Sequence, residues 1–512
     1  MSVSRSGALL LALACFAGCG DEGGGSPAKT CVAGKQVECA CPGGGLGVKA
    51  CRADGLGYDA CVGCGGGGGS GGSSGSGGSS GSGGSGGSSG SGGGSGGKRS
   101  GPVVLDGSSL SDDQGRFNAL GATMMWAAWG YKHDKARLEQ NLAFLAQHGF
   151  HYVRALGVVG DYSANDYWDG REIDWHWPDY DQVIAGLTDL AYDQYGLRIE
   201  WTLIGDGQKN LPNPADRQAL VDRFVAMSQG REHKIIHFEL ANEAWQNGFG
   251  GAQGESELRA LTQYLNGKTN ILVAASAPDP SVCSATQALY AGGIADLATL
   301  HFDRDVGQVD GHWRPVWQPW WVHGCAGIPV ASNNEPIGPG ASVSSENGVL
   351  ELVTGAVASY VSGLPLHVFH SSAGVRGDQN LWEMSGADAF SALPSYVPGD
   401  LASWARRDPK ASDAPLRFYA EEGGQAKPDV MWPELSAPES GVVAAPGSVS
   451  GKSFLVLPLG ILNQAQMEAR AALSLEVVDV VTGQVVAQHE LAAGQKLSLG
   501  GAGARVLRGT LK

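Results

Sequence analysis

The segment IIHFELANEAW, residues 235–245, is an apolar run that ends in the polar pair Asn242-Glu243. A second segment, IPVASNNEP at residues 328–336, has the same arrangement, with Glu335 after its apolar run. Short apolar runs bounded by polar residues are typical of strands that are buried on both faces. The two segments therefore predict strands of a parallel sheet that carry acidic side chains at their carboxyl ends.

Apolar strands and amphipathic helices alternate on both sides of these segments. Helix signals separate the strands, such as Asn213-Pro214 at a start and Gly149 or Gly196 at a stop. Eight strand–helix units predict a (β/α)8 barrel. A doubly wound sheet is the alternative, but no glycine-rich phosphate loop follows any strand, which favours the barrel. The expected strands are residues 122–128, 152–158, 198–204, 235–240, 271–275, 297–302, 328–331 and 366–369.

Beyond about residue 410 the helical period gives way to short apolar runs separated by Gly, Pro and Asn, which indicates a small β-sandwich. Before the barrel, one stretch consists of Gly and Ser alone and predicts a flexible tether. The chain is thus expected to consist of a signal peptide (1–19), a cysteine-rich module (20–64), a Gly/Ser linker (65–100), the barrel (101–408) and the sandwich (409–512).

The N-terminus has a basic start, a short apolar run and small residues before Cys19. This pattern is typical of a secretory signal. Residues 16–19, FAGC, resemble the bacterial lipobox, with Phe where Leu is usual, so Cys19 is expected to become the lipidated N-terminus. An ordinary signal peptide is the alternative. The protein is therefore expected outside the cytoplasm, as an envelope-anchored lipoprotein or an extracellular protein.

The cysteines fall into two groups. Six lie in the module before the tether, and so many cysteines in a short segment of an exported chain predict three disulfides. Six cysteines allow fifteen pairings, all of which are open. A zinc site is not favoured, because no second CxxC or His pair completes one. Cys283 and Cys325 lie in barrel loops, where they either pair or remain two buried thiols. The six are Cys31, Cys39, Cys41, Cys51, Cys61 and Cys64.

Composition excludes several partners. The 512 residues include 35 Lys and Arg against 51 Asp and Glu, a formal charge of −16 without a basic run, which argues against nucleic acid and anionic membranes as partners. All 14 Trp follow residue 100. Because flat aromatic faces stack on pyranose rings, a tryptophan-rich barrel is suited to a glycan.

The two strand ends resemble those of clan A glycoside hydrolases, the cellulase-like barrels that include family 5. That family has Asn-Glu after strand four and a second Glu after strand seven, which are the positions expected here for Asn242-Glu243 and Glu335. The resemblance covers roughly residues 105–405. It implies a retaining mechanism with Glu243 as acid/base and Glu335 as nucleophile, and with Asn242 bonded to the sugar 2-hydroxyl.

Two features depart from the family. Strand four ends in Asn-Glu-Ala, whereas the family's Asn-Glu-Pro occurs at residues 334–336, so a slip in the strand count would make Glu335 the acid/base. Three strand–helix units before Glu243 favour the count given. Strand eight ends in His370, where many relatives have the Trp that floors the sugar subsite.

The resemblance implies further roles near the strand ends. Arg154 is expected to orient the nucleophile, and Glu239, with the inward parity of Glu243, to pair with it. His301 and, more weakly, His370 are expected beside the nucleophile. Trp245 is the aromatic expected to contact the sugar, among a larger set in the barrel loops: Trp126, Trp129, Trp168, Trp175, Trp177, Trp313, Trp317, Trp320 and Trp321.

The sequence thus predicts an enzyme, a secreted glycoside hydrolase acting on a β-linked glycan. A non-catalytic glycan-binding protein on a decayed barrel is the alternative, which the change at His370 supports. No cofactor and no metal site are predicted, because the acids at Asp303, Asp305 and Asp310 lack the ligand spacing and glycine of a calcium loop.

Overall fold

The computed structural model divides the chain into two compact units, Met1–Ser89 and Gly90–Lys512, which are described separately. In the first unit the structure describes a two-stranded antiparallel sheet, β1 (Gln36–Ala40) and β2 (Leu46–Ala50). The described residues are 36–40, 46–50, 52, 98–160, 168–205, 211–279, 281–302, 316, 318–320, 325–336, 349–408, 411–422, 425–428, 446–458, 465–499 and 505–512.

Several predictions for the N-terminal region and the loops fall outside these residues. They concern the signal segment with Cys19, the Gly/Ser tether, the side chains of the six-cysteine module, the three Asp residues of the loop after strand six, and Trp313, Trp317 and Trp321. Among the described helices, none combines the length and the apolar character that crossing a membrane requires.

The second unit contains the predicted barrel. Eight parallel strands form a closed sheet, and the last strand pairs with the first through Leu366 and Ala119. In order, they are β6 (Ala119–Thr123), β7 (Tyr152–Val158), β8 (Arg198–Ile204), β9 (Ile235–Ala241), β10 (Val273–Ala274), β11 (Leu297–Leu300), β12 (Val330–Asn333) and β13 (Leu366–Phe369).

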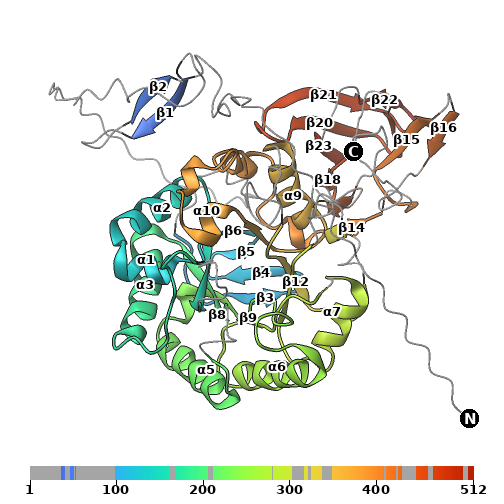
Figure 1. Cartoon of the computed structure of the whole chain (residues 1–512). Helices are drawn as coiled ribbons and strands as arrows, with labels where there is room; N and C mark the ends of the chain where they lie inside the picture. Colours follow the sequence, from blue (N-terminus) through green and yellow to red (C-terminus); the bar gives the residue numbers. More distant parts are fainter. Residues whose placement is uncertain are drawn as a thin grey trace, which may run out of the picture. The chain divides into compact units, whose positions relative to one another are not determined.

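Helices surround this barrel, as Figure 1 shows. The longer ones are α1 (Ala127–His133), α2 (Lys135–Gln147), α3 (Tyr180–Tyr195), α5 (Pro214–Ser228), α6 (Gly251–Asn266), α7 (Cys283–Tyr290) and α9 (Val349–Val361). The shorter ones are α10 (Ser372–Arg376), η1 (Glu232–Lys234), η3 (Leu381–Glu383), η4 (Ala389–Ser395) and η5 (Leu401–Ser403).

The first predicted strand, residues 122–128, is wrong at both ends, because β6 begins at Ala119 and shares only residues 122 and 123 with it. Strand β6 stops at Thr123, and α1 already begins at Ala127. Met124, Met125 and Trp126 are buried in the turn between them, so the apolar run continues across the end of the strand. The seventh strand is shifted to residues 330–333, because Asn333 is buried inside the barrel although its polarity suggested a loop.

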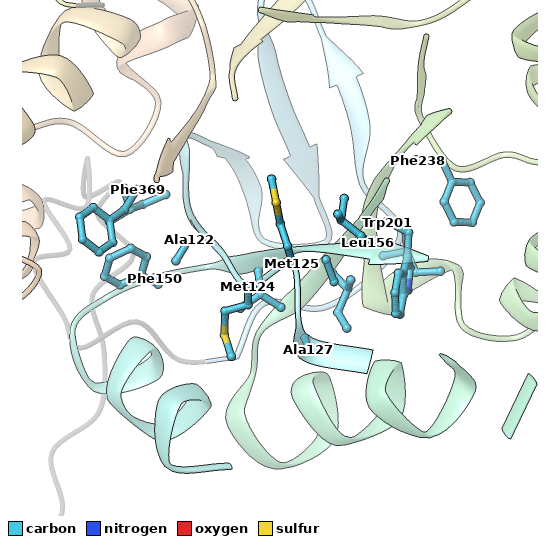
Figure 2. Packing of buried hydrophobic residues seen from close by; sticks show 14 of the residues in the cluster. Ala122, Met124, Met125, Ala127, Phe150, Leu156, Trp201, Phe238 and Phe369 are labelled. Carbon is cyan, nitrogen blue, oxygen red and sulfur yellow. The ribbon is translucent and has the colours of Figure 1, made fainter. Parts of the chain in front are cut away.

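The main core lies between the strands and the helices (Figure 2). Trp201 of β8 and Phe238 of β9 both pack edge-on against Phe224 of α5, at ring-centre distances of 5.5 and 6.2 Å. Thr202 and Glu239, which follow Trp201 and Phe238 in the sequence and so point to the opposite face, are hydrogen-bonded to each other at 2.6 Å. The two faces of these strands therefore differ: one is apolar and meets the helices, and the other holds buried polar groups.

A three-stranded antiparallel sheet precedes the barrel, and the sequence analysis did not predict it. It consists of β3 (Val104–Asp106), β4 (Ser109–Asp112) and β5 (Gly115–Phe117). Leu110 and Phe117 of this sheet share an apolar cluster with residues at the starts of the barrel strands, including Leu297 and Leu366. This sheet covers the amino-terminal end of the barrel, which leaves the carboxyl ends of the strands for a site.

The predicted C-terminal sandwich is confirmed. Apolar residues of both its sheets form one cluster, including Phe418 and Met467 from one sheet and Phe454 and Leu475 from the other. The six-stranded sheet has the order β14 (Ala405–Arg407), β17 (Gly447–Ser450), β18 (Ser453–Val456), β23 (Arg505–Leu511), β20 (Leu473–Asp479), β21 (Val485–Leu491). The four-stranded sheet has the order β16 (Gln425–Pro428), β15 (Leu416–Glu422), β19 (Ala465–Ala469), β22 (Lys496–Ser498).

The sandwich packs on the barrel. Val480 and Val506 belong to the main core, and the Tyr396 hydroxyl donates a hydrogen bond to the Val480 carbonyl at 2.6 Å. Strand β14 lies within the range expected for the barrel but pairs with β17. The sandwich therefore begins a few residues before the expected boundary.

Cys283 and Cys325 form a disulfide that spans 42 residues of sequence. It joins the start of α7 to the segment just before β12. Of the two alternatives for these cysteines, pairing is confirmed.

Burial of His367 predicts an acid-sensitive barrel. Burial lowers the pKa of His367 to about 3, from an ordinary value of 6.5. Below pH 6.5 the unfolded chain therefore binds a proton that the folded chain does not. The free energy of unfolding consequently decreases as the pH is lowered. Between pH 7 and pH 5 this group removes about 2 kcal/mol.

We expect His367→Asn to flatten the dependence of urea unfolding on pH over this range. Some slope remains, since burial lowers the pKa of His151 to about 4. The matched control is the variant His176→Asn, at an exposed histidine, which should leave the slope unchanged. An unaltered slope in His367→Asn would contradict this account.

Candidate active site

The predicted site residues come together at the carboxyl ends of the barrel strands. Asn242 and Glu243 directly follow β9, the fourth barrel strand, and Glu335 follows β12, the seventh. The expected strand count is therefore correct. His301 follows β11 and His370 follows β13.

The two glutamates face each other across His301. Its Nδ1 lies 3.1 Å from Glu243 Oε1 and 3.7 Å from Glu335 Oε2. One oxygen of each carboxylate and this nitrogen all lie within 4.8 Å of one another. The Glu335 side chain is 7% exposed and that of Glu243 26%, so only Glu243 has substantial access to solvent.

Arg154 holds Glu335 from the interior of the barrel. Its Nη1 donates to Glu335 Oε1 at 2.6 Å, and its Nη2 donates to Glu239 Oε2 at 2.9 Å and to Asn242 Oδ1 at 2.7 Å. Its Nε lies 3.2 Å from Glu200 Oε1. One buried guanidinium thus fixes the positions of three carboxylates, and the expected pairing of Arg154 with Glu239 is confirmed.

Electrostatics in this cluster favour the charged forms. Burial opposes the charge of Arg154, but Glu239, Glu335 and Glu200 outweigh it and raise its pKa above the ordinary value. Burial likewise raises the pKa of Glu200, yet His237 and Arg154 outweigh this effect, so its pKa lies below 4.5. The interior therefore holds ionised groups that stabilise one another.

The loop that carries Glu243 is strained and well anchored. Glu243 has a backbone φ of 37°, an uncommon conformation for a residue other than glycine and often found at functional sites. The Ala244 amide donates to Ser276 Oγ at 2.9 Å, and the Asn247 side chain donates to the Asn242 carbonyl at 2.9 Å. The Gln246 amide donates to Glu243 Oε2. These bonds fix the direction of the Glu243 carboxylate.

Each of the two histidines has a hydrogen-bond partner other than the glutamates. The His301 amide donates to Ser281 Oγ at 3.0 Å, and the His370 Nδ1 lies 2.9 Å from the Thr123 hydroxyl. The opposite nitrogen of His370 lies 3.7 Å from Glu335 Oε2. At the position where many relatives have Trp, this chain therefore presents an imidazole to the second glutamate.

The loop tryptophans divide by exposure. Trp245 is 46% exposed beside Glu243, whereas Trp126 and Trp168 are buried. The Trp126 indole donates to the Ala373 carbonyl at 3.0 Å, so this ring is part of the core. Among the described rings of the predicted set, Trp245 is the most exposed; Trp320 is buried, and three others are partly buried against the core: Trp129, Trp175 and Trp177.

Sequence reasoning missed an inner layer of polar groups. His237 Nε2 lies 3.4 Å from Glu200 Oε1, and the Asn334 amide donates to the same Glu200 oxygen at 2.8 Å. Glu200 and Thr202 of β8 point to the same inward face of the barrel as Glu239 of β9. This alternation along the strands is the sequence pattern that could have indicated the inner layer. Gln246 had no such signal, because it lies in a loop.

Comparisons with known proteins agree with the fold. No protein-family model matches the chain, and no curated protein matches its sequence. The chain is similar to a solved structure titled glycoside hydrolase, at TM-score 0.57 and 14% identity over 80% of this chain and 97% of the other. A glycoside hydrolase family 5 protein from Bacteroides vulgatus has the same score and identity, over 80% and 94%.

At this identity the similarity establishes the fold alone. The closed eight-stranded barrel is similar in fold to these glycoside hydrolase structures, so the resemblance drawn from the strand-end glutamates is confirmed at the level of the fold.

Replacing Arg154 by Gln should leave buried carboxylates without their shared cation. Loss of one partner of a buried ion pair destabilises by about 3–5 kcal/mol, and we expect a decrease of this size in urea unfolding. Glu239→Gln is the variant for comparison, because it removes a negative charge from the same cluster. It should lower the free energy of unfolding less than Arg154→Gln does. Equal stability of Arg154→Gln and the unaltered protein would disprove the structural role of Arg154.

Proposed function

We propose that this protein is a retaining glycoside hydrolase that acts on a β-linked glycan, with Glu243 as acid/base and Glu335 as nucleophile. The observation that carries the proposal is the approach of the two carboxylates, which have oxygens within 4.8 Å of each other. Retaining enzymes have carboxyl groups about 5–5.5 Å apart, and inverting enzymes leave about 6.5–9.5 Å for a water molecule. The spacing therefore favours retention.

In the first step, Glu335 Oε2 attacks the anomeric carbon while the bond to the leaving oxygen breaks. Glu243 donates its proton to that oxygen, and a glycosyl ester of Glu335 forms. Arg154 binds Glu335 Oε1, which aims Oε2 at the strand ends and keeps the nucleophile ionised before attack. The greater exposure of Glu243 suits a group that exchanges protons with the leaving group and with water.

In the second step, the ionised Glu243 takes a proton from water, and the oxygen of that water attacks the anomeric carbon. The ester bond breaks and Glu335 regains its negative charge. Two displacements leave the configuration of the anomeric carbon unchanged. His301 Nδ1, 3.1 Å from Glu243 Oε1, helps to hold the acid/base in place.

Further observations support a glycan substrate. Trp245, two residues after Glu243, is exposed, and the fold neighbours are titled glycoside hydrolases. A non-catalytic glycan-binding protein would retain Trp245 but would have no reason to keep two facing carboxylates and the arginine that orients one of them. This arrangement favours the enzyme.

The glutamate roles can be separated with aryl β-glycosides that have a good leaving group. Glu243→Ala should lower turnover by about 10²–10⁴-fold, the usual contribution of general acid/base catalysis. Azide should restore turnover as the β-glycosyl azide, because the glycosyl ester still forms and azide needs no base. Glu335→Gln should be inactive with or without azide.

Glu255, exposed on α6, is the matched control, and Glu255→Gln should retain full turnover. Mass spectrometry of the unaltered protein with a 2-deoxy-2-fluoro glycoside should show one added sugar, on Glu335. Turnover by Glu335→Gln on a substrate that the protein accepts would refute the mechanism. Glycan binding without any product in the unaltered protein would support the binding-protein alternative.

Trp245 should contribute to substrate affinity more than to turnover. Loss of one stacked aromatic ring removes about 0.5–1.5 kcal/mol, so Trp245→Ala should raise KM several-fold while kcat stays within about twofold. Trp382, 40% exposed and near Phe144 of α2, is the control and should have no effect as Trp382→Ala. Equal KM values for the two variants would exclude Trp245 from the subsite.

A further inference from the structure

A groove lies between the C-terminal sandwich and the barrel, with a volume of about 1340 Å³. One wall is the face of the six-stranded sheet that turns away from the sandwich core. The other wall consists of the 394–404 segment and of Gln114 and Arg116, at the turn from β4 to β5. Because β4 and β5 cover the amino-terminal end of the barrel, the groove is separate from the glutamates at the carboxyl ends of the strands.

A row of polar side chains crosses the sheet wall of this groove. Glu476 of β20 lies opposite Gln488 of β21 on one side and Arg508 of β23 on the other. Gln488 Nε2 donates to Glu476 Oε1 at 3.0 Å, and Arg508 Nε donates to Glu476 Oε2 at 2.8 Å. Arg508 Nη1 also donates to the Ser395 carbonyl of the opposite wall at 2.9 Å. These bonds fix the directions of the three side chains and join the two walls.

A second polar row lies two residues further along the strands, so it faces the same way. Ser474 lies opposite Glu490 and Thr510, and Thr510 lies opposite Ser453 of β18. Leu475, between the two rows, belongs to the sandwich core. Since neighbouring strands lie about 4.7–4.9 Å apart, the four strands give a polar surface about 14 Å long. Both the length and the volume of the groove suit a chain of several units, because a pocket for one small molecule has only about 300–1,000 Å³.

Trp404 supplies an aromatic ring on the wall opposite the sheet. This ring is partly exposed in the groove and packs against the main core. Its Nε1 donates to Asp400 Oδ1 at 3.1 Å, which fixes its orientation. A sugar ring has C–H groups on its faces and hydroxyl groups around its rim, so it can contact an aromatic face and polar side chains at the same time. The groove offers both kinds of surface.

The charges of the groove are largely paired. Its ion pairs are Arg508–Glu476 at 2.8 Å, Arg116–Asp106 at 2.7 Å and the contact of Lys512 with Glu490. Such pairs offer hydrogen-bond donors and acceptors without a strong field of one sign, which suits hydroxyl groups better than phosphate groups or metal ions. A protein partner would instead require a central patch that is apolar and poor in charged residues.

We propose that this groove is a second glycan-binding site, which takes a neutral β-linked oligosaccharide chain across the sheet and against Trp404. A long glycan bound there stays close to the protein, which raises the effective concentration of its other segments at the active site. The choice of β-linked chains rests on the proposed function, whereas the polar rows and the aromatic ring of the groove do not.

Binding is tested by calorimetric titration of the full chain with β-linked hexasaccharides of glucose, mannose, xylose and galactose. All proteins in this test carry Glu335→Gln, so that the chains are not cleaved. We expect two binding events for an accepted hexasaccharide, one at the active site and one in the groove. Failure of all four hexasaccharides to give an event that depends on groove residues would overturn the proposal.

Variants of the groove identify the second event. Gln488→Ala should weaken that event by about 2- to 12-fold, the effect of one hydrogen bond, and Trp404→Ala should weaken it by a similar factor through loss of ring contact. Because Trp404 packs against the core, its variant can fail to fold, whereas Thr510→Arg obstructs the groove from an exposed position and should abolish the event. Gln484→Ala is the matched control, since Gln484 is exposed on the same hairpin and does not line the groove.

Activity separates this inference from the proposed function. With Glu335 intact, Gln488→Ala and Thr510→Arg should keep the kcat and KM of the unaltered protein on an aryl glycoside with a single sugar. Both should raise KM on the polysaccharide. Equal hexasaccharide affinities in Gln488→Ala, Thr510→Arg and Gln484→Ala would overturn the groove site while hydrolysis continues. Binding in the groove by a protein that hydrolyses no glycan would refute the proposed function and leave the groove site intact.

Discussion

The site depends on the ion pairs of Arg154 inside the barrel. A fully buried guanidinium cannot lose its charge, so it requires carboxylates around it, and it binds Glu335, Glu239 and Glu200 at 2.6, 2.9 and 3.2 Å. Because these three come from or follow β12, β9 and β8, the same contacts tie distant strands together. The orientation of Glu335 is thus a consequence of charge compensation in the core.

The closed sheet imposes opposite requirements on its two faces. Outward residues such as Trp201 and Phe238 meet Phe224 on the helix side and must be apolar. Polar residues of alternate parity, such as Thr202 and Glu239, form a network that must satisfy itself away from water. The small sheet at the amino-terminal end covers one opening, so the network reaches solvent only where the strands end and the loops begin.

Much of the architecture could be predicted because burial on both faces leaves a visible signal. Residues 152–158, 198–204 and 366–369 are strands with the expected bounds, since polar or glycine residues flank their apolar runs. Where the turn itself is buried, as at Met124 and Trp126, the apolar run gives no boundary and the prediction failed. The three-stranded sheet was missed because its strands have three or four residues each, too few to show a period.

The barrel, the order of its strands and the glutamates after the fourth and seventh strands could be predicted from the sequence, because they follow from local periodicity and from the parallel direction of the strands. The tertiary structure alone sets how close Glu243 comes to Glu335, brings Glu200 and His237 together beside Arg154, and turns two imidazoles toward the Glu335 carboxylate. Such relations join residues that lie from 34 positions apart, as His301 and Glu335 do, to 92 positions apart, as Glu243 and Glu335 do. They depend on barrel closure and on side-chain packing, neither of which is encoded in any single segment.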